Sequence, residues 1–199
     1  GELAVAGNNI TIVGTTDDAT ITVNKAYPNP VKVNKNVTFK NLNINFADVK
    51  GSESYNGFNS QGNTLVFDNC TFTGQTTAAG GKFIYNNCSF KAENTYPAFV
   101  YSDVAEYNNC VFEGKDRAAK VYNEQFSCKA TYNNCTFKAA TADKAAVEID
   151  CSLPSNANKS VFEIIINNAT LVNMGQAADY GNEYFNLETA GVGLGIVTL

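Results

Sequence analysis

Hydrophobic and polar residues alternate in short runs along much of this chain. Four of these runs are residues 10–13, 20–23, 64–67 and 82–85. Alternation of this kind places every second side chain on the same face of a β-strand. Apolar residues spaced three and four apart, which would indicate amphipathic helices, are rare. The pattern therefore predicts an all-β chain.

A seven-residue pattern occurs six times and indicates how the strands are organised. Each copy reads apolar or small, aromatic, any residue, Asn, small apolar, any residue, large apolar. The copies are residues 38–44, 66–72, 84–90, 106–112, 131–137 and 165–171. Their asparagines are spaced by 28, 18, 22, 25 and 34 residues, which fits a coil whose turns carry loops of different lengths better than a helical repeat or a propeller blade.

The repeated asparagine has a structural explanation. A corner between two strands without a loop needs one residue in the left-handed conformation, and Asn tolerates this conformation best after Gly. In a coil, equivalent residues lie about 4.8 Å apart, so stacked amides can hydrogen-bond from rung to rung and satisfy one another when buried. We expect a buried ladder made of the following residues: Asn41, Asn69, Asn87, Asn109, Asn134 and Asn168.

This pattern resembles the asparagine ladder of the pectate-lyase-like superfamily, over roughly residues 31–172. The resemblance implies a right-handed parallel β-helix, a solenoid of about six rungs, with the ladder between the second and third strand of each rung. We expect a single domain over residues 1–199. Residues 1–30 form the N-terminal cap and first rung, residues 31–172 the ladder rungs, and residues 173–199 the C-terminal cap, because solenoids cover their free strand edges.

Composition narrows the possible partners. The net charge is −5, which argues against nucleic acid and anionic membrane surfaces as binding partners, because both bind basic surfaces. No apolar run is long enough to span a bilayer. Histidine and tryptophan are absent, which removes the commonest general base and the strongest sugar-stacking side chain. The chain starts at Gly1 without a Met or a signal peptide, so we expect an exported protein from which the leader has been removed, extracellular or at a bacterial cell surface.

Four of the six cysteines follow a ladder asparagine directly: Cys70, Cys88, Cys110 and Cys135. We expect them to point inward as small apolar residues and to form a stack of free thiols, because a spacing of about 4.8 Å between rungs exceeds the Cβ distance of a disulfide. No pattern supports a metal or another cofactor. Cys128 and Cys151 lie outside the repeat, and the sequence leaves open whether they pair.

Three ladder asparagines also start glycosylation sequons: Asn69, Asn87 and Asn134. A buried ladder residue could not carry a glycan. The sequons therefore favour a bacterial protein over a eukaryotic secreted one.

A second strand precedes several ladder motifs, at residues 98–101, 119–122 and 146–149. Alternation predicts that three valines of these strands point inward: Val100, Val121 and Val147. It then predicts one exposed column made of Tyr101, Tyr122 and Glu148, and a neighbouring column made of Asp103, Glu124 and Asp150. In pectate-lyase-like enzymes this strand and the loop after it line the substrate groove, so the resemblance directs attention to this face.

Three functions compete for this face. Tyr101, Tyr122 and Glu148 would suit a non-catalytic binding site for an extracellular polysaccharide or for a host or cell-surface protein. Packing between the tyrosines alone would instead fit a structural or adhesive spacer. The third function is a polysaccharide hydrolase or lyase using two of Asp103, Glu124 and Asp150 as acid and base, but no catalytic motif of the family is present and Arg117 is the one arginine. A calcium site formed by these acids is not supported, because the sequence has no Asp-x-Asp-x-Asp loop of the kind that usually binds this ion. We predict the non-catalytic role.

Overall fold

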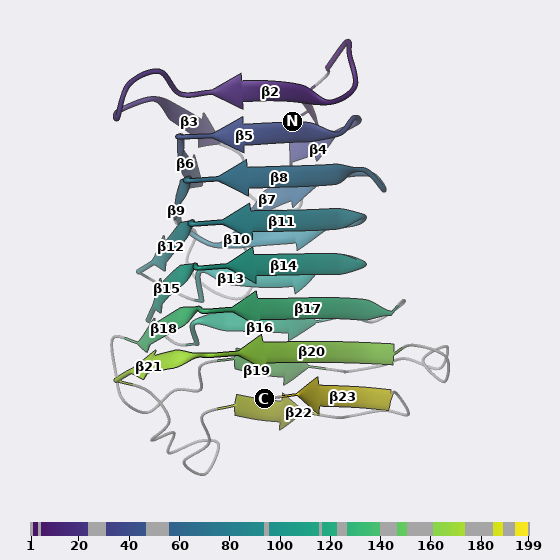
Figure 1. The fold of residues 1–199 in the computed structure, drawn as a ribbon, viewed down its shortest axis with the longest axis vertical. Helices are drawn as coiled ribbons and strands as arrows, with labels where there is room; N and C mark the ends of the chain where they lie inside the picture. The colour runs from purple at the N-terminus through teal and green to yellow at the C-terminus, as the bar shows by residue number, and fades with distance from the viewer. Residues whose placement is uncertain are drawn as a thin grey trace.

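Three parallel β-sheets wind around a common axis in the computed structural model (Figure 1). The structure describes residues 2–3, 5–23, 31–46, 56–93, 96–115, 117–122, 127–139, 147–150, 161–173, 185–188 and 194–198. These residues contain strands and turns and no helix. The predicted all-β parallel β-helix is confirmed.

Each sheet contains one strand from each successive coil, and we call the sheets A, B and C in the order in which a coil passes through them. Sheet A consists of β1 (Glu2–Leu3), β4 (Val31–Val33), β7 (Gly57–Asn59), β10 (Thr76–Ala79), β13 (Ala98–Tyr101), β16 (Ala119–Tyr122), β19 (Val147–Asp150) and β22 (Phe185–Glu188). Sheet B consists of β2 (Ile10–Val13), β5 (Val37–Lys40), β8 (Thr64–Asp68), β11 (Lys82–Asn86), β14 (Val104–Asn108), β17 (Cys128–Asn133), β20 (Val161–Asn167) and β23 (Leu194–Thr198). Sheet C consists of β3 (Thr20–Val23), β6 (Asn43–Phe46), β9 (Thr71–Thr73), β12 (Ser89–Ala92), β15 (Val111–Gly114), β18 (Thr136–Ala139) and β21 (Thr170–Val172).

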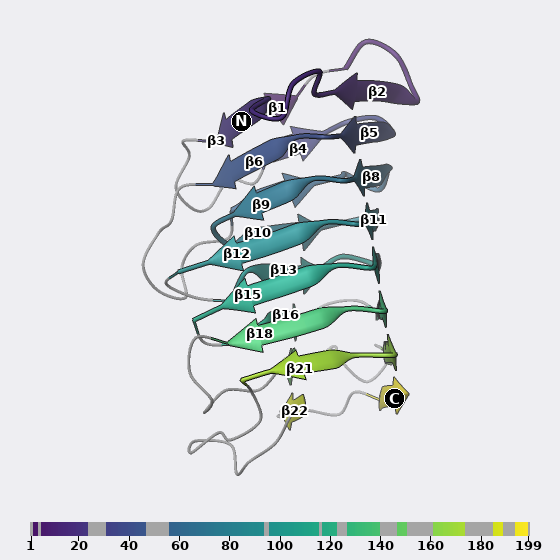
Figure 2. The ribbon, with the colours of Figure 1, turned by 60° about the vertical axis from the view of Figure 1, so that its left-hand side comes forward.

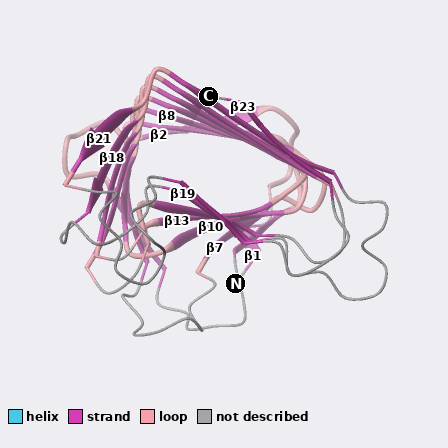
Figure 3. Cartoon of the chain, turned by 90° about the horizontal axis from the view of Figure 1, so that it is seen from below, coloured by secondary structure: helices cyan, strands magenta, loops and turns pink. Residues whose placement is uncertain are grey.

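The winding is right-handed, as predicted. Figure 3 looks at the molecule from below, so the coils advance toward the viewer from the N-terminal end to the C-terminal end. In that view the chain passes along sheet B, turns into sheet C and returns along sheet A in a counter-clockwise path. Figure 2 shows the same coils from the side of sheet C, with β6, β9, β12, β15 and β18 one above the other.

Equivalent residues of neighbouring coils stack in register and fill the interior. Tyr85 of β11 pairs with Phe67 of β8 on one side and with Tyr107 of β14 on the other. The rings of Tyr85 and Tyr107 lie 4.8 Å apart and are inclined by only 4°. A second aromatic stack on sheet C meets the first one edge-on, as in the contact of Tyr85 with Phe90 at 5.1 Å and 76°. These two stacks are the centre of the hydrophobic core.

The ladder asparagines form the corner between sheets B and C. All six have the predicted left-handed conformation, with φ between 53° for Asn41 and 58° for Asn168. The expected burial is wrong, because the side chains of all six are exposed. The left-handed residue turns its own side chain outward, whereas the next residue, such as Leu42 or Cys70, points into the core. Burial therefore does not prevent these asparagines from carrying glycans. The three sequons thus no longer favour a bacterial protein over a eukaryotic secreted one.

The six ladder coils are flanked by further strands at both ends. Strands β1, β2 and β3 form a first coil in which Gly14 occupies the position of the ladder asparagine, since its N–H donates to the Lys40 carbonyl at 2.9 Å just as the Asn41 N–H donates to that of Asp68. Strands β22 and β23 continue sheets A and B beyond the last ladder motif. Residues of both predicted caps thus take part in the sheets.

Candidate functional site

The four cysteines of the repeat form a buried column of free thiols, as predicted. The Cys110 thiol lies 3.5 Å from the carbonyl oxygen of Tyr85 in the preceding coil and 3.5 Å from that of Asn108. Hydrogen bonds between neighbouring thiols, together with burial, raise the pKa of Cys88 and Cys135. Both side chains are therefore neutral packing groups, and the described residues include no cluster of Cys, Asp and Glu that could hold a metal ion.

Cys128 is also buried. The sequence left open whether Cys128 pairs with Cys151. Cys151 itself lies outside the described residues.

The outer face of sheet A carries the predicted site residues. The valines expected to point inward, Val100, Val121 and Val147, are fully buried. Tyr101 and Tyr122 lie on the opposite face of adjacent strands and are half-buried. Their rings lie 6.0 Å apart at an angle of 21°. The structure therefore brings the two tyrosines together.

The register of β19 differs from the predicted column by two residues. Glu148 lies beside Lys120, and Asp150 lies beside Tyr122. The column of Tyr101 and Tyr122 therefore continues with Asp150, and Glu148 belongs to the next column of the same face. Alternation predicted which face each residue occupies, but it is unchanged by a shift of two residues, so it could not determine the register.

Four aromatic side chains form one cluster on this face. Phe99 lies at its centre, with ring centroids 5.9 Å from Tyr96, 6.4 Å from Tyr101 and 5.8 Å from Tyr122. Phe99 is only 2% exposed although it points away from the core. The Lys120 ammonium lies 5.5 Å from the centre of the Tyr122 ring, a distance at which a cation is attracted by the ring. We call these five residues the aromatic surface.

The predicted acids do not form one column. Asp103 is exposed and lies two residues beyond Tyr101, where its carbonyl oxygen accepts a hydrogen bond from the Lys129 N–H at 2.9 Å. Asp150 shares the column of the tyrosines instead of that of Asp103. Glu124 lies outside the described residues. The register therefore separates Asp103 from Asp150, which the predicted column had aligned two rungs apart with Glu124 between them.

Carboxylates on the outer faces of sheets B and C pair with lysines of neighbouring coils. The pairs are Lys40–Asp68 at 3.3 Å, Lys82–Glu106 at 2.9 Å, Lys91–Glu113 at 3.4 Å and Lys129–Glu163 at 2.9 Å. All of them are solvent-exposed to a similar degree, and exposed pairs contribute little to stability. Because each carboxylate is solvent-exposed and paired with a lysine, none of the four has the desolvated environment that a general acid needs.

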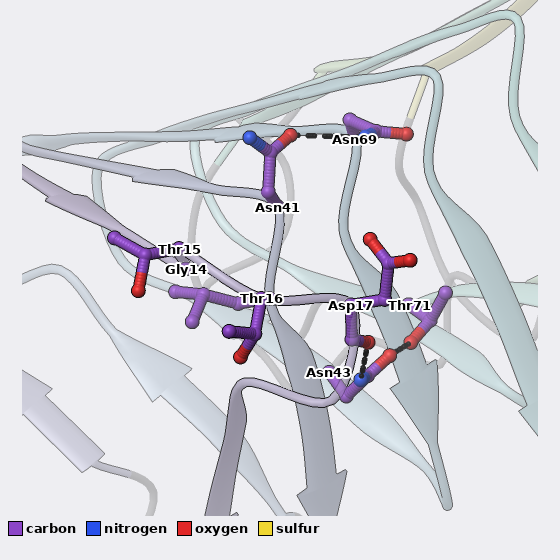
Figure 4. A pocket seen from close by; sticks show the side chains of 9 residues that line it. Gly14, Thr15, Thr16, Asp17, Asn41, Asn43, Asn69 and Thr71 are labelled. Carbon is purple, nitrogen blue, oxygen red and sulfur yellow. Dashed lines mark hydrogen bonds between the residues drawn. The ribbon is translucent and has the colours of Figure 1, made fainter.

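Sequence reasoning missed a polar pocket of about 390 Å³ at the corner of the first coils (Figure 4). In each ladder coil a single Asn joins sheet B to sheet C, but in the first coil residues 14–18 occupy this place. The longer connection stands away from the corner and forms one wall of the pocket. The opposite wall contains Asn41, Asn43, Asn69 and Thr71. The lack of the ladder motif in residues 1–30 was the one sequence signal that this corner differs.

Comparisons of the chain with protein-family models, with curated proteins and with solved structures find no match. The three stacked parallel sheets establish the β-helix, and the resemblance to the pectate-lyase-like superfamily stays a prediction from the sequence pattern. The described part of the chain has no helix of the length and apolar character needed to cross a membrane.

Proposed function

We propose that this chain is a non-catalytic, extracellular binding protein that recognises a polysaccharide through the aromatic surface of sheet A. The observation that carries the proposal is the pair of half-buried rings of Tyr101 and Tyr122, held 6.0 Å apart by adjacent strands. Aromatic side chains with a polar tip provide both an apolar surface for the C–H groups of a sugar and a hydroxyl for hydrogen bonding.

The two tyrosines are held in place before any ligand binds. Both rings lean on Phe99, at 6.4 Å and 5.8 Å, and Phe99 in turn contacts the buried ring of Tyr96 at 5.9 Å. Strands β13 and β16 are backed by the buried side chains of Val100 and Val121. A site whose side chains are already ordered loses less conformational entropy on binding.

One charged side chain lies beside the rings, and the neighbouring strand contributes two acidic residues to the register. Lys120 lies over the Tyr122 ring at 5.5 Å. The register places Asp150 next to Tyr122 and Glu148 next to Lys120 on β19. Binding sites of small molecules commonly combine an apolar surface with a few polar groups that fix the orientation of the ligand.

Absence of catalysis is part of the proposal. A retaining or inverting glycosidase needs two carboxyl groups on either side of one glycosidic bond. On the aromatic surface the register separates Asp103 from Asp150, and the ion-paired acids of sheets B and C lie on other faces. A bacterial cell surface or the extracellular space is the proposed location, and a cell-surface protein is the second candidate partner.

The experiment is a glycan array probed with the wild-type chain and with the Tyr101→Ala/Tyr122→Ala double variant. The matched control is Val66→Ala/Ile84→Ala, which removes two half-buried side chains from the outer face of sheet B in adjacent coils. We expect binding by the wild type and the control but not by the tyrosine variant, with circular dichroism showing that all three are folded.

Release of reducing ends from each bound polysaccharide is measured in parallel. Release that stops when Asp103, Glu124 or Asp150 is changed to its amide would contradict the non-catalytic proposal. Binding that survives in the tyrosine variant would move the site elsewhere. Absence of binding to every glycan would favour the structural or protein-adhesive role.

A further inference from the structure

The ladder amides are joined head to tail, so the ladder has a donor end and an acceptor end. The Asn69 side-chain N–H donates to Oδ1 of Asn41 at 2.9 Å, that of Asn134 donates to Asn109 at 3.3 Å, and that of Asn168 donates to Asn134 at 2.8 Å. Asn41 is the first member and has no preceding amide to which it could donate. Within the described residues its Nδ2 has no hydrogen-bond partner, and in Figure 4 this nitrogen points away from Asn69, toward the side of Gly14 and Thr15.

No side chain at the ladder position of the first coil can accept a hydrogen bond from Asn41 Nδ2. Gly14 occupies the ladder position there, and a Cβ on Gly14 would lie 2.0 Å from the Asn41 carbonyl oxygen and 2.8 Å from the Cβ of Ala19. Both contacts are shorter than real structures tolerate, and the first contact is with the backbone. The pocket of about 390 Å³ lies over this corner. The protein therefore ends its own ladder at Asn41 and leaves space beside it.

We propose that this pocket binds the acetamido group of an N-acetylated sugar. The carbonyl oxygen of the acetamido group would accept a hydrogen bond from Asn41 Nδ2 and so occupy the place of the next amide in the ladder. A planar amide matches this position because the ladder repeats amide-to-amide hydrogen bonds. The site is distinct from the aromatic surface of sheet A, and the inference does not depend on the proposed function.

The remaining lining fits a sugar better than a peptide. Thr15, Thr16 and Asp17 line the pocket together with the ladder residues, and in Figure 4 the Asp17 carboxylate points to the same side as the Asn41 and Asn69 amides. These groups can exchange hydrogen bonds with the ring hydroxyls of a monosaccharide, whereas an Asn or Gln side chain from a protein carries no such hydroxyls. Leu42, which is 7% exposed, is the apolar side chain in the lining and offers a contact for the acetyl methyl group.

Two contacts keep the ladder side of the pocket rigid. The Asn43 amide donates to the Asp17 carbonyl oxygen at 2.9 Å, and its Oδ1 accepts a hydrogen bond from the Thr71 hydroxyl. The first contact links the residue 14–18 connection to the second coil. The pocket therefore has a defined shape without ligand, which lowers the cost of binding.

The experiment is a titration of the ¹⁵N-labelled chain with N-acetyl-D-glucosamine, followed by two-dimensional NMR. D-glucose, which lacks the acetamido group, and a blocked asparagine peptide are the comparison probes. We expect the side-chain amide signals of Asn41 and the backbone signals of residues 14–17 to shift with N-acetyl-D-glucosamine and to stay unchanged with the other two. Equal shifts with glucose, larger shifts with the peptide, or no shift at this corner would overturn the inference.

Asn41→Asp is the decisive variant. Aspartate tolerates the left-handed conformation and still accepts the hydrogen bond from Asn69, but it has no donor for the acetamido oxygen. We expect affinity for N-acetyl-D-glucosamine to fall by about tenfold or more, the loss of one hydrogen bond that leaves a polar group unpaired. Gln61→Glu adds the same charge at the turn between sheets A and B and should bind like the wild type, as should Tyr101→Ala/Tyr122→Ala. Unchanged binding by Asn41→Asp would refute the inference.

Discussion

Removing two buried hydroxyl groups from the aromatic stack of sheet B should stabilise this protein. Tyr85 and Tyr132 are fully buried, and neither hydroxyl oxygen has a hydrogen-bond partner in the structure. The same column carries Phe39 and Phe67 in earlier coils, where the rings stack at 4.8 Å and 7°. A phenylalanine ring therefore already fits this position, and Tyr85→Phe and Tyr132→Phe change only the unpaired group.

The expected gain follows from the cost of desolvation. A buried polar group without a partner costs about 1–3 kcal/mol. The space left by one oxygen, about 10 Å³, costs only about 0.2 kcal/mol. Each substitution should thus raise the free energy of unfolding by about 1–3 kcal/mol. For a chain of this size, this corresponds to about 2–12 °C in the melting temperature.

Urea unfolding followed by circular dichroism measures this effect, with the midpoint compared at constant m-value. Tyr107→Phe is the matched control, because the Tyr107 hydroxyl is not among the unpartnered buried atoms, and it should gain less than either of the other two. A loss of stability of about 1 kcal/mol or more in Tyr85→Phe or Tyr132→Phe would refute the reasoning, because it would mean that the hydroxyl is satisfied in solution.

Three further predictions concern the same columns. Burial raises the pKa of Tyr85, Tyr107 and Tyr132 well above the usual value, so these groups ionise at lower pH in the unfolded chain than in the folded one. The free energy of unfolding should therefore be constant below about pH 9 and should fall above about pH 10, by about 1.4 kcal/mol per pH unit for each tyrosine. Urea midpoints that do not change between pH 9 and 11 would contradict this. Asn109→Ala should lower the free energy of unfolding by about 2 kcal/mol, because alanine disfavours the left-handed φ of 55° and cannot form the hydrogen bond to the Asn87 side chain at 3.3 Å. Asn109→Gly should cost about 1 kcal/mol less, because glycine adopts this φ without strain. Equal costs in urea unfolding would show that the backbone conformation is unimportant at this position. Five cysteines are buried, so a thiol reagent should modify at most one thiol per folded chain and all six after unfolding, and rapid modification of two or more in the folded chain would show that the column is open.

The repeat was sufficient to predict the interior of the β-helix. A residue such as Phe67, one position before Asp68 and two before Asn69, must point inward when the strand alternates and the corner needs a left-handed residue, and both conditions are local. The same local rules placed Cys70 and Cys110 in the core. These properties depend on neighbouring residues in the chain, so the sequence was enough to infer them.

Features that depend on how one coil meets the next could not be inferred in the same way. The direction of the Asn41 side chain depends on the geometry of the corner, and the expectation of a buried ladder was therefore wrong. The position of Glu148 depends on the register between β16 and β19, which alternation leaves undetermined by any even shift. The pocket depends on how residues 14–18 fold back over Asn41 and Asn43, and no repeat describes that connection.

Isothermal titration calorimetry with a polysaccharide bound on the array measures whether the two tyrosines bind the ligand. The wild-type chain, Tyr101→Ala/Tyr122→Ala and Val66→Ala/Ile84→Ala are compared under the same conditions. We expect the tyrosine variant to lose about tenfold or more in affinity, because aromatic anchors commonly contribute at least this much to binding. The sheet B variant should bind like the wild type, and the polysaccharide should be recovered uncleaved. Equal affinities for all three chains, or shortened polysaccharide after the titration, would contradict the proposed function.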